Sequence, residues 1–492
     1  MITFSTAKNG EKTCEIAGKH LHSAYNPSRE AEQFVSRLEA SFDPSAVIII
    51  EPVLSHCLPF LKKRFPKATL CAVRLSDDFS AYDGGWHCCL KADESLADSL
   101  YDSLGEEKLC AALFYAWPAS EQAFAAEARA AWEAIRSAVL KSRDVLATRS
   151  FFARRWMKNA VVFCRQIRHP ARIAHGSCGI LIAASGTSLK TSLPKIREYR
   201  DRFFLIAVSS ALLPLSSHGI MPDLVISTDG GYWAKKHLAQ CGEDFSAIPF
   251  AVSAEGACPA AVLEHNPIVP LRYDDGAETK LLNACGIDSM PAKRNGTVSG
   301  TAAEFALALT SGNIYFCGLD LATAKGFQHT QPNALERLHE AKDNRLRTKD
   351  TRIAASEFGA HGALDLYRNW FVAESPRLSK RLFRLSDNFA FRGRLGQIED
   401  INWNDFLARE PAQKAEKPAI VVAQERNMDC APILEKALHE LLDSADFARE
   451  LCPVEVMLKK RALSEEEKAS CDAAITKKME AFKKELRGML HG

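Results

Sequence analysis

The sequence lacks the features that mark several large classes of protein. Lys and Arg number 63 against 61 Asp and Glu, so there is no basic excess to bind nucleic acid. The first residues, MITFSTAKNGEKTCEIAG, do not have the basic and then apolar layout of a secretory signal. The longest apolar stretch, which begins at Phe203, is shorter than the ~20 residues that cross a bilayer. We therefore expect a protein with neither a nucleic-acid partner nor a membrane segment.

The cysteines form no recognisable pattern. There are 15 of them, no Cys-x-x-Cys pair occurs, and Cys88-Cys89 is the single close pair. This spacing suits neither a zinc site nor a redox dithiol. Dispersed cysteines without a secretory signal are typical of reduced thiols, so we expect a cytoplasmic protein in which most cysteines are small buried apolar residues.

Several catalytic signatures are also missing. The histidines show no HxxxH or HExxH pattern, so no dedicated metal site is predicted. The GxSxG motif of hydrolases is absent, as are the Walker A loop and the GxGxxG fingerprint. Whether a divalent metal assists the chemistry stays open at this point.

What is present is ordinary globular sequence that changes character along the chain. The 492 residues are 47% hydrophobic and 25% charged, which is enough for more than one core. We predict a Rossmann-like N-terminal domain, a helical connector, a catalytic core and a helical C-terminal domain, at residues 1–115, 116–170, 171–405 and 406–492. The connector helix is expected to begin at Ser120 as its N-cap.

The N-terminal domain is predicted to lack a nucleotide site. Val47–Ile50 reads as a strand buried on both faces, and Thr69–Val73 as a second strand. The turn after the first strand, Glu51–Leu54, contains no glycine. A Rossmann site needs glycine there so that the backbone can approach a pyrophosphate, and we therefore expect this domain to be structural.

The core alternates between strand and helix signals, which predicts a doubly wound α/β fold with a parallel sheet. Helix-like segments at Leu193–Tyr199 and Ala302–Leu309 separate short apolar runs. The six predicted strands are Ile180–Ala184, Phe203–Val208, Leu224–Ser227, Phe250–Val252, Ile268–Leu271 and Ile314–Cys317. Because ligands of such sheets bind beyond the carboxyl ends of the strands, the residues after each run are the candidates for chemistry.

Two glycine- and hydroxyl-rich helix starts are suited to an anion. Ser185, Gly186, Thr187 and Ser188 follow the first core strand and precede a helix. A second set consists of Ser299, Gly300 and Thr301, which open the helix at Ala302–Leu309. Exposed backbone N–H groups and the positive end of a helix hold phosphate, although such a turn can equally be a simple N-cap.

Charged and imidazole groups follow two other strands. Asp229 lies after Leu224–Ser227 with two glycines beside it, where it could accept hydrogen bonds from a ribose or simply cap its loop. Asp320 follows the last core strand, and His329 comes nine residues after it. A loop histidine near a strand end is a candidate general base, although most such histidines are surface residues.

The ordered set of motifs resembles the motility accessory factor (Maf) family. The matching segments are ILIAASGTSL, IAVSSALLPLSSHGIMPDLVISTD and NGTVSGTAAEFALALTSGNIYFCGLDLA. The resemblance covers about residues 150–400 and implies a core similar to that of bacterial sialyltransferases. The family's phosphate loop usually reads Gly-Pro-Ser-Leu, where this chain has Gly186-Thr187-Ser188-Leu189.

The resemblance implies a glycosyltransferase. Its donor would be a CMP-activated nonulosonic acid, its acceptor a Ser or Thr hydroxyl of flagellin, and no other cofactor is expected. Ser185–Ser188 would lie against the donor phosphate, Ser209 and Asp229 would line the pocket, and Ser299–Thr301 with Asp320 would complete it. His329 would deprotonate the acceptor. The alternatives are a pterin pyrophosphokinase that uses ATP and Mg²⁺, and a non-catalytic accessory factor that binds flagellin.

Overall fold

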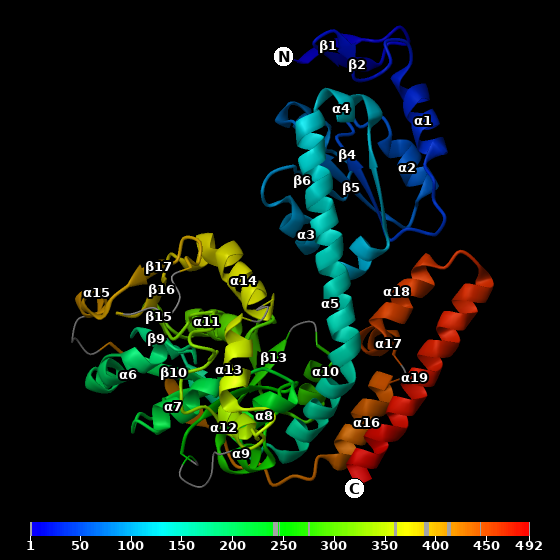
Figure 1. The fold of residues 1–492 in the computed structure, drawn as a ribbon. Coiled ribbons are helices and arrows are strands. Elements are labelled where there is room, and N and C mark those ends of the chain that lie inside the picture. Colours follow the sequence, from blue (N-terminus) through cyan, green and yellow to red (C-terminus); the bar gives the residue numbers. More distant parts are fainter. Residues whose placement is uncertain are drawn as a thin grey trace. The chain divides into compact units, whose positions relative to one another are not determined.

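The computed structural model describes residues 2–239, 245, 247–273, 276–358, 362–387, 393–410, 415–442 and 444–491. The chain divides into two compact units (Figure 1). The first unit comprises Met1–Ala153 and Ser444–Glu485, and the second comprises Arg154–Asp443 and Leu486–Gly492. Each unit is described by itself below.

The first unit contains two small sheets. An antiparallel sheet has the order β1-β2-β3, and a parallel sheet has the order β6-β5-β4-β7. The strands are β1 (Ile2–Thr6), β2 (Lys12–Ile16), β3 (Lys19–His20), β4 (Ala46–Ile50), β5 (Thr69–Arg74), β6 (Cys88–Lys91) and β7 (Ala112–Ala116). Every residue of β4 is buried, as its continuous apolar sequence predicts for a central parallel strand.

Helices cover both faces of this parallel sheet. The helices before the connector are α1 (Pro27–Arg37), α2 (Leu58–Arg64), the 3-10 helix η1 (Asp77–Tyr82), α3 (Leu96–Cys110) and α4 (Pro118–Ala123). Val47 and Ile49 pack in one apolar cluster with residues of α1 and α2. Ile48 and Ile50 pack in a second cluster with residues of α3 and of the long helix α5 (Ala125–Gln166).

The predicted N-cap of the connector is wrong. Ser120 lies inside α4, not at a helix start, and its hydroxyl donates to the carbonyl oxygens of Glu51 and Trp117. Pro118 begins that helix, because a proline is well accommodated in the first turn where its missing N–H is not needed.

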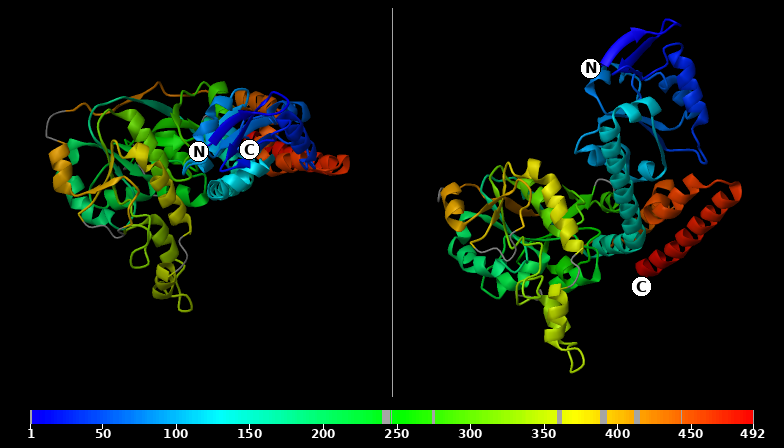
Figure 2. Two further views of the ribbon diagram at one scale, coloured as in Figure 1. Left: turned by 90° about the horizontal axis from the view of Figure 1, so that it is seen from above. Right: turned by 45° about the horizontal axis from the view of Figure 1, so that its top comes forward.

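The C-terminal helices of the first unit are α17 (Ala445–Leu451), α18 (Pro453–Arg461) and α19 (Glu465–His491). Helices α18 and α19 run side by side in Figure 1 and in both views of Figure 2. Ion pairs join them, with Lys459 Nζ 2.6 Å from Asp472 Oδ1 and Lys478 Nζ 2.5 Å from Glu455 Oε1.

The second unit contains a large sheet with the order β17-β16-β15-β9-β10-β11-β12-β13-β8-β18, and β14 pairs with β13. All its described pairs are parallel except the edge pair β18–β8. The strands are β8 (His169–Ala174), β9 (Ile180–Ala183), β10 (Phe204–Val208), β11 (Leu224–Ser227), β12 (Phe250–Ser253), β13 (Pro267–Tyr273), β14 (Met290–Ala292), β15 (Ile314–Cys317), β16 (Leu382–Leu385), β17 (Glu399–Ile401) and β18 (Ala419–Val422).

Helices connect these strands. They are α6 (Leu189–Glu198), η2 (Arg200–Arg202), η3 (Ser209–Ala211), α7 (Leu212–Ser216), α8 (Tyr232–Leu238), α9 (Ala260–His265), α10 (Glu278–Ala284), α11 (Val298–Leu309), α12 (Ala334–Glu340), α13 (Lys349–Phe358), α14 (Gly362–Leu378), α15 (Trp403–Arg409) and α16 (Ala431–Leu442). Helix α11 contacts β9, β10, β11 and β15, so it covers the middle of the sheet.

The prediction of an α/β protein with a mostly parallel sheet is confirmed, as are a small N-terminal α/β sheet and a helical C-terminal region. All six predicted core strands are present, with ends shifted by no more than two residues. The helix predicted at Leu193–Tyr199 begins earlier, at Leu189, and the one predicted at Ala302 begins at Val298. The predicted boundaries of the four domains stay predictions, since compact units need not coincide with domains.

Candidate functional site

The order of the strands reverses between β9 and β15. From β9 the chain continues through β10, β11, β12 and β13 on one side, and β15, β16 and β17 lie on the other. In open parallel sheets the crevice at such a reversal is the usual ligand site. The loops that leave β9 and β15 meet there, because Ala184 N donates to Cys317 O (2.8 Å) and Gly186 N donates to Gly318 O (2.8 Å).

The carboxylate of Asp320 binds the loop that follows β9. It accepts hydrogen bonds from Ser188 N (2.7 Å, to Oδ2), from Thr187 Oγ1 (3.2 Å, to Oδ2) and from Ser188 Oγ. Asp320 and Ser188 are both buried. The donors that the sequence assigns to a phosphate at Thr187 and Ser188 therefore already hold an internal anion. In the ligand-free chain, Asp320 positions this loop.

Gly186 is required for the close approach of the two loops. A Cβ atom at this position would lie 2.5 Å from Gly318 O and 2.7 Å from Asp320 Oδ2. Contacts of this length do not occur in real structures, and one of the obstacles is backbone, which cannot turn aside as a side chain can. The single glycine of the predicted phosphate loop thus serves the packing of β9 against β15.

Ser185 connects this loop to His329. The hydroxyl of Ser185 lies 2.8 Å from His329 Nδ1, and Ser210 Oγ donates to Ser185 Oγ at 2.7 Å. Ser185 and His329 are 144 residues apart in the sequence. The predicted base and the predicted phosphate loop therefore share one site, although what each does there stays a prediction.

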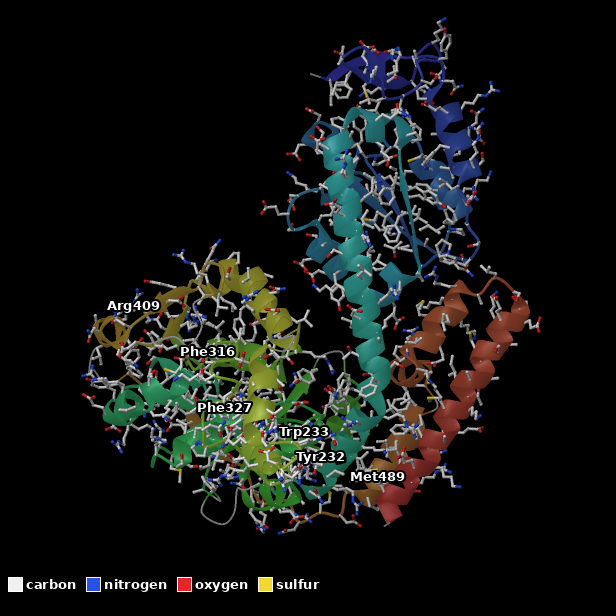
Figure 3. The ribbon with its side chains drawn as sticks, in the orientation of Figure 1. Tyr232, Trp233, Phe316, Phe327, Arg409 and Met489 are labelled. Carbon is white, nitrogen blue, oxygen red and sulfur yellow. The ribbon has the colours of Figure 1, made fainter. Side chains whose placement is uncertain are left out.

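The segment that carries His329 is fixed against the same loop. Thr330 N donates to Ser185 O (2.7 Å), and Thr330 Oγ1 donates to Gly186 O (2.6 Å). Asn333 Nδ2 donates to Ser210 O (3.3 Å). Phe327, labelled in Figure 3, marks the start of this segment. Nothing in the sequence around Thr330 and Asn333 indicates these contacts.

Burial keeps the imidazole of His329 neutral. Loss of solvent disfavours its charged form and lowers its pKa to about 4. The ring of His237, on α8, lies with its centroid 6.0 Å from that of His329 and perpendicular to it. Burial, and to a lesser degree the neighbouring His329, lower the pKa of His237 to about 4 as well. A neutral imidazole has one nitrogen free to accept a proton, which is the form a general base needs.

Two predicted pocket residues lie beside this site in different ways. Ser209 is buried in the turn η3, and it is the next residue, Ser210, whose hydroxyl reaches Ser185. Asp229 is exposed after β11, and its Oδ1 accepts a hydrogen bond from Gly231 N at 2.8 Å. That contact closes a local turn.

Ser299, Gly300 and Thr301 form the first turn of α11. A Cβ at Gly300 would lie 3.0 Å from the ring of Trp370, so α14 packs closely on this turn. Thr301 Oγ1 donates to Lys293 O at 2.9 Å. The helix starts at the same edge of the sheet as α6, because it leads from β14 back to the parallel strand β15.

A buried polar cluster that the sequence analysis missed follows β12 and β13. Arg294 forms two hydrogen bonds with Glu255, Nη1 to Oε2 at 2.7 Å and Nη2 to Oε1 at 3.2 Å. Its guanidinium also lies over the rings of Trp156 (4.7 Å) and Tyr273 (4.5 Å). No motif signals this arrangement, because the residues come from separate segments of the sequence.

Glu278 is the least stabilised acid of this cluster. Its Oε1 accepts a hydrogen bond from Tyr273 N (2.9 Å), and its buried Oε2 has no partner among the described residues. Burial, together with the nearby charge of Glu255, raises the pKa of Glu278 to about 8. Burial also raises the pKa of Tyr273 to about 12. Both groups are therefore largely protonated at neutral pH.

Two aromatic residues on the start of α8 face solvent. Tyr232 and Trp233, labelled in Figure 3, are 57% and 44% exposed. Their rings pack perpendicular to each other with centroids 5.3 Å apart, and Lys236 Nζ lies over Tyr232 at 5.0 Å. They lie one to two turns of α8 before His237.

Within the described ranges, no group of three or more His, Cys, Asp or Glu side chains could hold a metal ion. None of the described helices combines the length and the apolar character needed to cross a membrane.

Comparisons with known proteins found similarities of sequence and of fold. Residues 154–326 match a family model described as "6-hydroxymethylpterin diphosphokinase MptE-like". An uncharacterized protein of Treponema pallidum (strain Nichols) is 29% identical over 329 residues, which cover 66% of this chain and 72% of that protein. The Maf glycosyltransferase from Magnetospirillum magneticum AMB-1 superposes with a TM-score of 0.52 at 13% identity, over 100% of this chain and 90% of that one. The fold of the chain is thus that of a Maf glycosyltransferase, as the resemblance of its motifs predicts.

Proposed function

We propose that the chain transfers a nonulosonic acid from its CMP derivative to Ser or Thr hydroxyls of flagellin. The observation that carries this proposal is the contact of Ser185 with His329 at the reversal of strand order. It unites a hydroxyl-bearing loop at a helix start, suited to a phosphate, with a neutral imidazole suited to a hydroxyl acceptor. The match of the whole fold to a Maf glycosyltransferase supports the same assignment.

The proposed reaction needs two events at one carbon. The acceptor oxygen forms a bond to the anomeric carbon of the sugar while the bond from that carbon to the phosphate oxygen of CMP breaks. CMP leaves with the electron pair, and the configuration inverts. The proton of the acceptor hydroxyl passes to His329, whose low pKa leaves it unprotonated and ready to accept. Tyr232 and Trp233 are exposed on α8, the same helix whose His237 packs on His329, and they would offer a protein acceptor an aromatic surface.

A second candidate is a diphosphokinase that acts on a pterin, because residues 154–326 match the MptE-like model. Such an enzyme transfers diphosphate from ATP, and it relies on Mg²⁺ bridging the phosphates. Asp229 is an exposed carboxylate at the carboxyl edge of the sheet, and it would be the residue to contribute to a metal–nucleotide complex.

Calorimetric titration separates the candidates. The full chain is titrated with CMP, CTP and ATP, each with and without Mg²⁺. The glycosyltransferase proposal predicts binding of CMP that does not depend on metal. Binding of ATP only with Mg²⁺ would favour the diphosphokinase, and no binding of any nucleotide would favour the accessory factor.

The role of His329 has its own test. His329→Gln removes the proton acceptor and keeps a side chain of similar reach, so flagellin glycosylation should fall by about 10²–10⁴-fold while the affinity for CMP changes little. His218→Gln is the matched control, since that histidine caps its own helix turn through a contact with Pro214 O. Equal glycosylation by both variants would remove His329 as the base.

A further inference from the structure

The hydroxyl groups around His329 fix the position of its proton. Ser210 Oγ donates to Ser185 Oγ, and Ser185 Oγ lies 2.8 Å from His329 Nδ1. A serine hydroxyl has one hydrogen to donate and two lone pairs that accept. Because Ser185 accepts from Ser210, its own hydrogen is available for Nδ1. The chain Ser210→Ser185→His329 then uses each hydroxyl hydrogen once and leaves the imidazole proton on Nε2.

The opposite arrangement satisfies fewer groups. If Nδ1 carried the proton, Ser185 would accept from both Nδ1 and Ser210, and its own hydrogen would have no acceptor among its contacts in the described chain. A donor without an acceptor in a site withdrawn from water is costly. This hydroxyl chain therefore favours the tautomer with hydrogen on Nε2, which cannot accept a proton there.

Among the hydroxyls of the Ser185–Ser188 loop, only that of Ser185 has no hydrogen bond to Asp320 in the described chain. Thr187 Oγ1 and Ser188 Oγ both donate to that carboxylate. A phosphate oxygen only accepts hydrogen bonds, so a phosphate at this loop would compete with His329 for the hydrogen of Ser185. Once that hydrogen points to phosphate, Ser185 Oγ can accept from Nδ1–H.

We propose that Ser185 and Ser210 are positioning residues that hold the proton of His329 on Nε2 until a phosphate-bearing donor binds, and on Nδ1 thereafter. This inference rests on the proposed function, and it adds that the base is formed only in the donor complex. In the change, Nε2 gives a proton to water and Nδ1 takes one from water, so the imidazole stays neutral. The lone pair on Nε2 is then available to take the proton of an acceptor hydroxyl.

A serine paired with a histidine can also be a nucleophile, but the surroundings of Ser185 do not support that role. A nucleophilic serine after a strand relies on the N–H of the next residue to stabilise an oxyanion. Here Gly186 N already donates to Gly318 O at 2.8 Å. Ser185 can thus donate a hydrogen bond through its hydroxyl, but the N–H of Gly186 is not available to stabilise an oxyanion.

The test is the tautomer of His329, read by multiple-bond ¹H–¹⁵N correlation on protein labelled with ¹⁵N-histidine. The signals of His329 are assigned by their absence in His329→Gln. The free protein should show hydrogen on Nε2, and saturation with CMP should move it to Nδ1. Ser185→Ala should abolish the response to CMP, and Ser185→Thr, which keeps a hydroxyl, should restore it.

Ser216→Ala is the matched control. Its hydroxyl donates to Leu213 O within α7, so its removal should leave both tautomers as in the unchanged protein. Hydrogen on Nδ1 in the free protein, or the same tautomer with and without CMP, would overturn the inference. Calorimetry distinguishes the two levels: binding of CMP without a change of tautomer refutes this inference alone, whereas absence of binding refutes the proposed function and the switch with it.

Discussion

Each of the two parallel sheets has a loop at the point where its strand order reverses, and the two loops bind their internal carboxylates differently. In the first unit, the strand order reverses between β4 and β7, and the loop after β4 surrounds the carboxylate of Glu51. That carboxylate accepts from the backbone N–H groups of Val53 (3.0 Å), Leu75 (2.8 Å) and Ser76 (3.2 Å). Arg74 Nη1 donates to it at 2.9 Å. The site where a nucleotide phosphate would lie in such a sheet is filled by the chain's own anion and a cation.

In the second unit, the corresponding loop after β9 binds the carboxylate of Asp320 with only some of its donors. Thr187 and Ser188 bind the carboxylate, whereas Ser185 turns to Ser210 and His329. An internal carboxylate that binds every donor of a loop leaves none for a phosphate. A carboxylate that binds only some of the donors positions the loop and leaves the others available.

The loops also differ in backbone conformation. Without glycine, the loop after β4 holds Glu51, Val53 and Ser55 at φ angles of 40°, 52° and 60°. Each costs ~1–3 kcal/mol, and the cost is highest for a β-branched residue such as Val53. The contacts of Glu51 with Arg74 and the three N–H groups offset this strain. The closed loop is thus a stabilising feature, consistent with the prediction that the N-terminal domain is structural.

The largest expected effect is at the closed loop. Glu51→Ala leaves three backbone N–H groups without their acceptor and removes one of the two carboxylates, Glu51 and Asp83, that pair with the buried Arg74, so the free energy of unfolding of the first unit should fall by about 3–5 kcal/mol. Urea unfolding followed by the fluorescence of Trp86 and Trp117, which lie in the same cluster, measures it. Glu94→Ala, at an exposed position, is the control and should change stability by less than about 0.5 kcal/mol. Equal losses in the two variants would refute the closed-loop account.

Asp320→Ala should cost less. It removes the acceptor of Ser188 N and of two hydroxyls but leaves no buried charge behind, so a loss of about 1–3 kcal/mol is expected. Urea unfolding followed by the fluorescence of tryptophans of the second unit, such as the buried Trp403, gives the value. A loss larger than that of Glu51→Ala would reverse the comparison between the two loops.

Gly186→Ala tests the open loop directly. The added methyl would lie 2.5 Å from Gly318 O, so the loop must shift and the affinity for CMP should fall about tenfold or more. Gly362→Ala is the matched control, because nothing lies within 4 Å of the Cβ position at this helix start. Unchanged affinity in Gly186→Ala would show that the loop after β9 does not hold the nucleotide.

The smallest effect concerns a third buried carboxylate, Glu278, which has a partner for only one oxygen. Burial raises the pKa of Glu278 from its ordinary value of 4.5 to about 8, so its contribution to stability is full below pH 4.5 and is lost as the pH rises from there through about 8. Between pH 7 and pH 8 the unchanged protein should lose about 1 kcal/mol more than Glu278→Gln. Thermal unfolding at both pH values measures this, and parallel curves would contradict the assignment.

The sequence predicts the strands well and the contacts between loops poorly. The core strands are continuous apolar runs, and that pattern is sufficient to find β9 to β13 and β15, but not the short strand β14. The pairing of β15 with β9 is not visible in the pattern, because it depends on where the chain reverses direction across the sheet. For that reason the sequence predicts that Asp320 and His329 lie near strand ends, but it does not predict that both contact the Ser185–Ser188 loop.

Local backbone geometry explains the remaining differences. The turn η3 directs Ser210, which the sequence did not single out, toward Ser185, and the role of Ser209 in lining the pocket stays a prediction. The cluster of Glu255, Arg294 and Glu278 consists of residues whose individual positions carry no motif, so only the fold brings them together. The residue types show which chemical groups the chain has, and the topology decides which of these groups lie in the same site.

The most direct test of the account is the calorimetric titration of CMP, without metal, into the unchanged chain and into Gly186→Ala. The account predicts that one CMP binds per chain and that the variant binds about tenfold more weakly or not at all. Absence of binding to the unchanged chain, or equal affinity of the two proteins, would contradict the claim that the loop after β9 is the open nucleotide site.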